Sequence, residues 1–161
     1  MEADRLAHRA GGQAIAAYLC GVKITELHLA GITLWIPHRL SRRSELLAEL
    51  AVGLTGIAAT SRYGFGWLNP PAPIVTWSFA RCALEDFQLV HAIVRELAPL
   101  GDDDVFFEAW SQALDLIGSS TYWRAIEELA ASVLRDPLTG IEATDLINRV
   151  CGENNSLIPL G

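Results

Sequence analysis

The segment from Leu50 to Ala59 is apolar on nearly every side of the helix that its spacing predicts. A helix that is apolar all round must be covered by other elements of the same molecule. This stretch is also too short to cross a membrane. We therefore predict a buried helix that starts with Ser41 or Ser44 as its cap and ends near Thr60.

The remaining patterns predict more helices and one β-hairpin. Val22–Leu29 and Ile32–Ile36 have the composition of strands, and the Ala30-Gly31 pair between them favours a tight turn. The fold class expected is mainly α with a small β-hairpin or sheet. Apolar residues at helical spacing predict helices over residues 3–20, 76–97, 102–117, 121–134 and 141–150, whereas residues 61–73 read as a loop and residues 153–161 as a loose tail.

Composition indicates one globular domain over residues 1–161. The chain is 51% hydrophobic and 19% charged, and it carries a net charge of −7. No concentrated basic surface is visible, so we expect no nucleic-acid partner. No uncharged run predicts a membrane span, and the acidic start, with Glu2 and Asp4, argues against a signal peptide. We expect a cytoplasmic protein whose cysteines, Cys20, Cys82 and Cys151, are buried free thiols.

The segment from His8 to Leu19, which begins His8-Arg9-Ala10-Gly11-Gly12, resembles the zinc-binding helix of the FtsH family of ATP-dependent zinc metallopeptidases. The family pattern there is H-E-A-G-H-A. Two histidines four residues apart share one helix face and hold zinc, and the glutamate serves as general base for the zinc-bound water. The resemblance places His8 at the first ligand position, Arg9 at the general-base position and Gly12 at the second ligand position.

Further segments resemble the family in the same order along the chain. Leu54–Thr60 resembles its second helix, although Thr60 replaces a glutamate, and Asp86 falls at the position of the third zinc ligand. Arg124–Ala130 followed by Leu138–Glu142 resembles the closing helices. The resemblance implies a degenerate peptidase core over residues 1–100 and C-terminal helices over residues 102–152. Because only seven residues precede the motif, we expect neither an ATPase module nor a membrane anchor.

The departures from the family pattern predict a catalytically inactive protein. Arginine stays protonated and cannot act as a base, and glycine has no side chain that could bind a metal. His8 and Asp86 leave two ligands, against the three that catalytic zinc sites use. We expect no catalytic residue and no cofactor, with zinc only if another ligand has been recruited. Three other histidines, His28, His38 and His91, are weak candidates for that role.

Two regions are candidates for binding a protein or peptide partner. In the family, substrate lies along a strand beside the metal site, so the predicted strand with Ile32 and Trp35 could bind an extended peptide by β-augmentation. The aromatic residues Tyr63, Phe65 and Trp67 could form a partner surface, or the loop could fold over the former cleft. A metal-dependent hydrolase with a rebuilt site and a structural homo-oligomer remain the alternatives.

Overall fold

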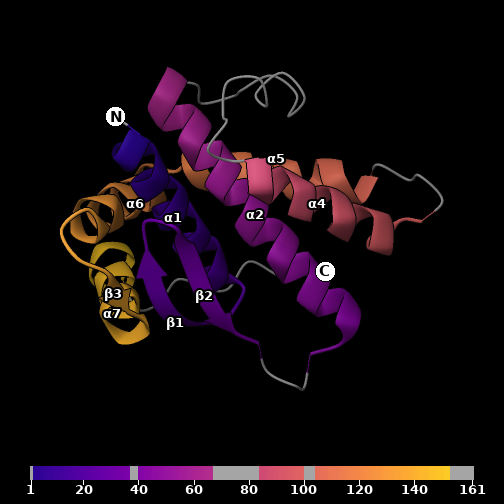
Figure 1. Ribbon diagram of the computed structural model, residues 1–161, viewed down its shortest axis with the longest axis horizontal. Helices are drawn as coiled ribbons and strands as arrows, with labels where there is room; N and C mark the ends of the chain where they lie inside the picture. Colours follow the sequence, from indigo (N-terminus) through magenta and orange to yellow (C-terminus); the bar gives the residue numbers. More distant parts are fainter. Residues whose placement is uncertain (1, 37–39, 67–83, 100–103, 153–161) are drawn as a thin grey trace.

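The apolar stretch lies in the middle of α2 (Arg42–Phe65), a helix of 24 residues. Every residue from Leu50 to Ser61 is buried. Ser41 caps the helix, because its hydroxyl accepts a hydrogen bond from Ser44 N at 3.1 Å. α2 crosses the molecule diagonally, with α4 and α5 on one side and α1, α6, α7 and the sheet on the other (Figure 1).

The computed structural model describes residues 2–36, 40–66, 84–99 and 104–152. Within them the fold is mainly helical with a small three-stranded sheet, which confirms the predicted fold class. None of the described helices is long and apolar enough to cross a membrane. In chain order the elements are α1 (Glu2–Leu19), β1 (Lys23–His28), β2 (Gly31–Trp35), α2 (Arg42–Phe65), α4 (Leu84–Leu97), α5 (Asp104–Gly118), α6 (Ser120–Val133), β3 (Leu138–Thr139) and α7 (Gly140–Cys151).

α2 continues through the start of the predicted loop, so the prediction of a loop from residue 61 is wrong for residues 61–65. Ser61 reads as a loop residue in sequence, but here its hydroxyl donates to Ile57 O at 3.0 Å inside the helix. The helix ends at Gly66, which adopts a left-handed conformation with φ of 68°. The predictions for residues 67–83, for the first residues of the helix at 102 and for the tail at 153–161 lie outside the described residues.

The sheet contains the predicted hairpin and a third strand that the sequence did not predict. Its order is β2-β1-β3, and both pairs are antiparallel. β3 has only two residues and leads directly into α7, where Thr139 and Glu142 form a capping box. The absence of a side chain at Gly140 allows the start of α7 to lie close to β1, because a Cβ on Gly140 would be 1.7 Å from Ile24 O.

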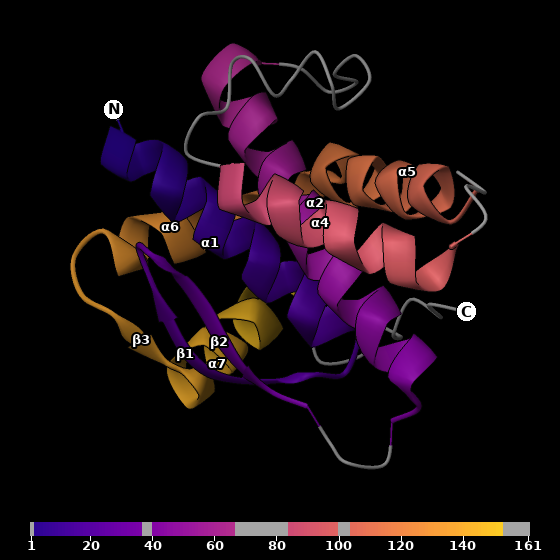
Figure 2. The same ribbon diagram turned by 45° about the vertical axis from the view of Figure 1, so that its right-hand side comes forward.

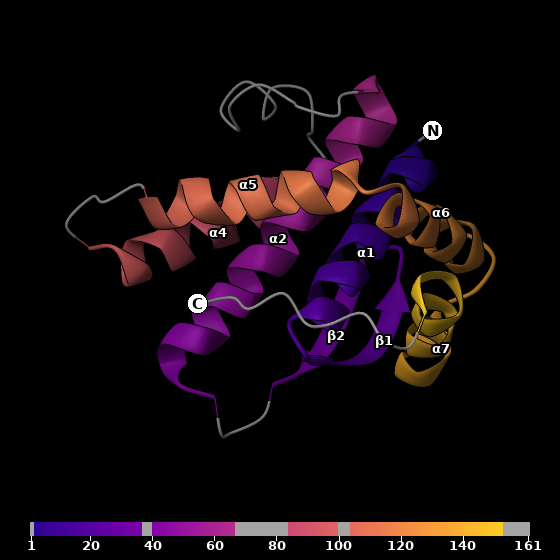
Figure 3. The ribbon, with the colours of Figure 1, turned by 180° about the vertical axis from the view of Figure 1, so that it is seen from behind.

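Two glycines in the middle of α1 have a packing role. α1 lies between α2 and α6, as the turned views show (Figures 2 and 3). A Cβ at Gly12 would lie 2.8 Å from Thr55 O on α2, and one at Gly11 would lie 2.9 Å from Ile126 O on α6. The two helices therefore approach the backbone of α1 closely from both sides, which gives a reason for two residues that disfavour helix.

Candidate functional site

A buried ion pair joins Arg9 of α1 to Asp86 in the first turn of α4, 77 residues further along the chain. Arg9 Nε donates to Asp86 Oδ2 at 2.5 Å, and Arg9 Nη2 donates to Asp86 Oδ1 at 2.6 Å. Arg9 is 7% exposed and Asp86 is 5% exposed. Two parallel charge-assisted hydrogen bonds in a buried place fix the relative position of the two helices more tightly than one bond could.

Two further groups complete the polar cluster around this pair. Gln13 Nε2 donates to Asp86 Oδ1 at 3.4 Å, and Arg9 Nη1 donates to Ala30 O, at the turn of the hairpin, at 3.2 Å. Arg9 and Gln13 are four residues apart and so share one face of α1. Gly56 of α2 leaves room for both side chains, because a Cβ there would lie 2.9 Å from Gln13 Cγ. The cluster therefore joins α1, α4 and the hairpin.

Gln13 Oε1 is a buried acceptor that has no hydrogen-bond partner among the described residues. Gln13 is 5% exposed. Its amide is oriented by Asp86, because the carboxylate can only accept and so takes the NH₂ group. Oε1 is left near the start of β2, where a Cβ on Gly31 would lie 3.7 Å away. A buried oxygen without a donor is uncommon, and it marks a place where a hydrogen-bond donor would be stabilised.

The residues of α1 that contact Asp86 differ from the two α1 positions that the resemblance assigns to metal ligands. The helix face of α1 that meets Asp86 carries Arg9 and Gln13, and not His8 and Gly12. Gly12 packs against Thr55 and Ala59 of α2, so a larger side chain at this position would strike α2. Gln13 and the Ala30 carbonyl were missed by sequence reasoning. The four-residue spacing from Arg9 to Gln13 could have predicted that these two side chains share a face of the helix. It was overlooked because the resemblance pairs His8 with Gly12 instead.

His8 lies in an aromatic cluster rather than beside Asp86. Its Nδ1 donates to Asp4 O at 2.7 Å, and its ring stacks on Tyr63 at 4.0 Å and on Trp123 at 5.7 Å between centroids. Burial lowers the pKa of His8, while the Asp4 carbonyl acts in the opposite direction. The Arg62 guanidinium covers the Trp123 ring at 4.1 Å. These contacts give His8 a packing role between α1, α2 and α6.

The predicted binding residues are divided between the hairpin and the end of α2. Trp35 is 51% exposed on β2, whereas Ile32 is half-buried and packs against the core. Tyr63 is partly exposed on α2, in contact with His8, instead of in a loop. Phe65 is the last residue of α2, but its side chain lies outside the described part of the chain, as does Trp67. The structure therefore places Trp35 and Tyr63 on separate elements.

Metal-ligating side chains do not gather anywhere in the described ranges. No group of three or more histidine, cysteine, aspartate or glutamate residues there could hold a metal ion. His28 ends β1, His91 lies on an exposed part of α4, and His38 is outside the described residues. The absence of a cofactor stays a prediction.

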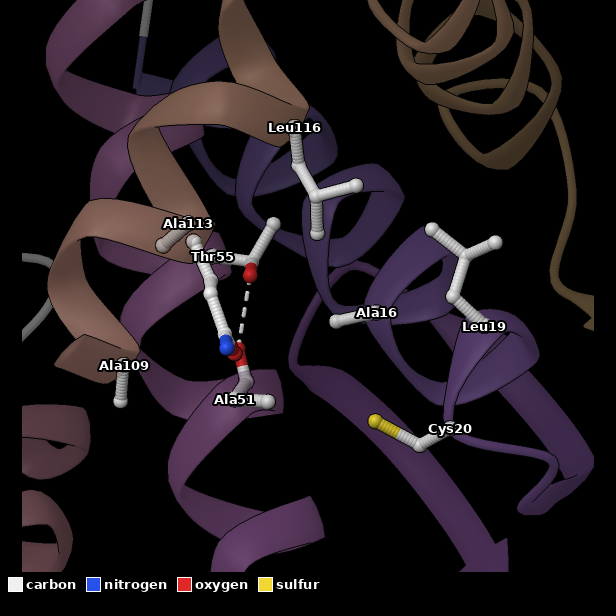
Figure 4. Close-up of a pocket in the computed structure, with 9 residues that line it drawn as sticks. Ala16, Leu19, Cys20, Ala51, Thr55, Ala109, Ala113 and Leu116 are labelled. Carbon is white, nitrogen blue, oxygen red and sulfur yellow. Dashed lines mark hydrogen bonds between the residues drawn. The ribbon is translucent and has the colours of Figure 1, made fainter. Parts of the chain in front are cut away.

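A small apolar hollow lies between α1, α2 and α5 (Figure 4). Its volume is about 10 Å³, close to that of a single water site. Cys20 borders the hollow, and burial raises the pKa of its thiol to about 12. The Thr55 hydroxyl at its wall is already bonded to Ala51 O at 2.7 Å. The hollow is lined by Ala16, Leu19, Cys20, Ala51, Thr55, Ala109, Gln112, Ala113 and Leu116.

No protein-family model, curated protein or solved structure matches this chain. The resemblance to the FtsH family therefore stays a prediction that is based on the motifs and their order.

Proposed function

We propose that the chain is a catalytically inactive relative of the FtsH-type peptidase domain that acts as a peptide-binding or scaffold module. The observation that carries the proposal is the buried contact of Arg9 with Asp86. Sequence reasoning assigned both positions to the same site, although they are 77 residues apart. Their contact supports a common origin with a site in which these elements met around a metal.

The chemistry of the cluster argues against hydrolysis. Arg9 carries a permanent positive charge, which cannot accept a proton from water and would repel a divalent cation. Asp86 is engaged by that charge through both of its oxygens. The third member, Gln13, offers an amide in place of a stronger metal ligand. In this arrangement an internal cation takes the role that the resemblance assigns to zinc.

The edge of β2 is the surface proposed for binding. Among the described residues, β2 pairs with a strand on one side only, that of β1. Thr33 O accepts a hydrogen bond from the Thr25 hydroxyl of β1 at 2.9 Å, so the backbone polar groups of Thr33 face β1. Those groups alternate sides along a strand, which directs the ones of Ile32 and Leu34 outward. An extended peptide could add there as a fourth strand.

Metal uptake tests the proposed loss of catalysis. The natural protein and an Arg9→His/Gln13→His variant would be exposed to zinc, dialysed and analysed by elemental mass spectrometry. The natural protein should stay empty, and the variant, with two histidines facing Asp86, should retain about one zinc per chain. A His8→Ala change added to the variant is the control and should leave its zinc content unchanged. Stoichiometric zinc in the natural protein would favour the alternative of a rebuilt hydrolase.

Peptide binding tests the proposed module. Random peptides displayed on phage would be selected against the protein, and the affinities of synthetic copies would be measured by fluorescence anisotropy. Each peptide would then be N-methylated on every second residue, in two complementary sets. An added strand directs alternate amides toward β2, so one set should abolish binding and the other should weaken it far less. Equal effects of both sets, or a failure to select any peptide, would contradict β-augmentation.

A further inference from the structure

The open edge of β2 presents two side chains to solvent on the outward face of the sheet. Thr33 and Trp35 are exposed, whereas Ile32 and Leu34, which alternate with them, pack against the core. The backbone groups of Thr33 face β1, and those of Trp35, two residues further on, have the same orientation. A residue of an added strand opposite Thr33 or Trp35 would therefore belong to a non-hydrogen-bonded pair, in which side chains lie closest together.

Two charged residues of β1 lie beside these side chains on the same face. The register pairs Glu26 with Thr33 and Lys23 with Trp35. Both charged residues are exposed, and neither forms an ion pair within the described ranges. On its other side Glu26 is paired with Thr139 of β3. The carboxylate of Glu26 therefore lies between two short side chains and is open to a ligand.

The two outward positions of β2 favour different ligand side chains. A residue opposite Thr33 would be two strand spacings, about 10 Å, from Glu26. Because Thr33 is short, a long basic side chain can extend over it and meet the carboxylate. Opposite Trp35 the indole fills the space, so an aromatic side chain gains a cross-strand contact there. Lys23 lies beyond the indole and disfavours a second basic residue at that position.

We propose that the edge of β2 selects an extended segment with a basic residue opposite Thr33 and an aromatic residue opposite Trp35. This inference rests on the proposed function and deepens it by naming the chemistry of the ligand. The net charge of −7 favours a basic ligand in general, and Glu26 determines where along the segment the positive charge lies. The two selected residues are separated by one residue, and their order depends on whether the segment adds parallel or antiparallel to β2.

Peptide selection on charge-reversed variants tests the assigned position of the basic residue. Phage-displayed peptides would be selected on the natural protein, on Glu26→Lys and on Glu108→Lys, which makes the same charge change at an exposed position of α5. The natural protein and Glu108→Lys should select a basic and an aromatic residue separated by one residue. Glu26→Lys should select an acidic residue in place of the basic one, at the same spacing from the aromatic residue.

Affinities of defined peptides measure the two contacts separately. The probes are a synthetic copy of the peptide selected on the natural protein and a second copy with glutamate in place of its basic residue, both followed by fluorescence anisotropy. Glu26→Lys should weaken the first about twofold to tenfold and strengthen the second by a similar factor, with smaller effects at high salt. Trp35→Ala should weaken both about threefold to tenfold, and Trp35→Phe should retain most of the affinity.

The gain in affinity for the acidic copy cannot result from misfolding of the variant. Equal effects of Glu26→Lys and Glu108→Lys on the two copies would overturn the inference, and so would selected peptides without a preferred basic residue. Either result leaves β-augmentation at β2 standing. If the natural protein selects no peptide, the proposed function fails and this inference fails with it.

Discussion

Arg9 of α1 and Asp86 of α4 both lose their hydration when the protein folds, and each charge is compensated by the other. Removing two charges from water costs several kcal/mol per ion, which close contact and good geometry can offset. The pair is therefore better understood as fixing one arrangement of α1, α4 and the hairpin than as a large net source of stability. Its energetic importance becomes visible when one partner is removed.

Single and double substitutions should separate these effects. Asp86→Ala leaves the Arg9 guanidinium buried without its carboxylate, so we expect the free energy of unfolding to fall by about 3–5 kcal/mol. Arg9→Met combined with Asp86→Leu replaces both charges by apolar groups and should cost far less, or even stabilise the fold. Urea denaturation of the natural protein and the two variants measures both values. A double variant as unstable as Asp86→Ala would show that the pair has further structural roles.

At this scale the sequence predicted which segments meet but not which side chains. Arg9, Asp86 and the motif helix were all assigned to one site, and the structure does bring these two residues together. The contact of Gln13 with Asp86 was not predicted, because a four-residue spacing fits either of two adjacent faces of a helix, that of His8 and Gly12 or that of Arg9 and Gln13. Only the position of α2 and α6 around α1 decides which face meets Asp86.

The packing of α1 against α2 and α6 depends on the absence of side chains at the crossing points. Gly12 meets the α2 backbone at Thr55, and Gly11 meets the α6 backbone at Ile126. Backbone atoms cannot rotate away as the end of a side chain can. Two glycines inside a helix disfavour it, and the structure shows that close packing against α2 and α6 explains their presence. Their neighbours could not be identified from one chain, because no local pattern specifies which helices cross.

Alanine substitutions at two helical glycines test this view. Gly12→Ala places a Cβ 2.8 Å from Thr55 O, so α1 and α2 must separate, and we expect a loss of about 1–3 kcal/mol in unfolding free energy. Gly118→Ala at the end of α5 is the matched control, because a Cβ there meets nothing within 4 Å. The control should be neutral or stabilise by up to about 1 kcal/mol through the unfolded chain. Equal effects in a denaturation experiment would contradict a close crossing.

At the scale of the whole molecule, the described residues are organised around one apolar core in which α1 and α2 are the central helices. Helical and strand periodicity predicted most of its helices and the hairpin, because burial of one face sets the spacing of apolar residues. β3 was not predicted, because a strand of two residues has no periodicity and exists only through its pairing with β1. The end of α2 was misplaced because Ser61 and Gly64 favour turns locally and are overruled by tertiary packing.

Cys20 links the stability of this core to pH. Burial raises the pKa of its thiol to about 12, so the folded protein keeps the thiol protonated where the unfolded chain ionises it. This contribution is fully present below the ordinary pKa of cysteine and is lost as pH rises from there toward about 12. Unfolding midpoints of the natural protein and Cys20→Ala should therefore converge as the solution becomes alkaline. Parallel curves over that range would contradict a buried thiol.

The central strand of the sheet has two neighbours at very different distances along the chain. β1 pairs with β2 across a tight turn. Its other partner, β3, is far along the chain, and the described residues between β2 and β3 form four helices. Closing a long loop has a larger entropic cost than closing a hairpin and slows folding. On a ribosome, α1 and the hairpin would emerge with one flank of β1 still unsatisfied. That flank is paired only when β3 has been synthesised, directly before α7, so the sheet is completed near the end of the described fold.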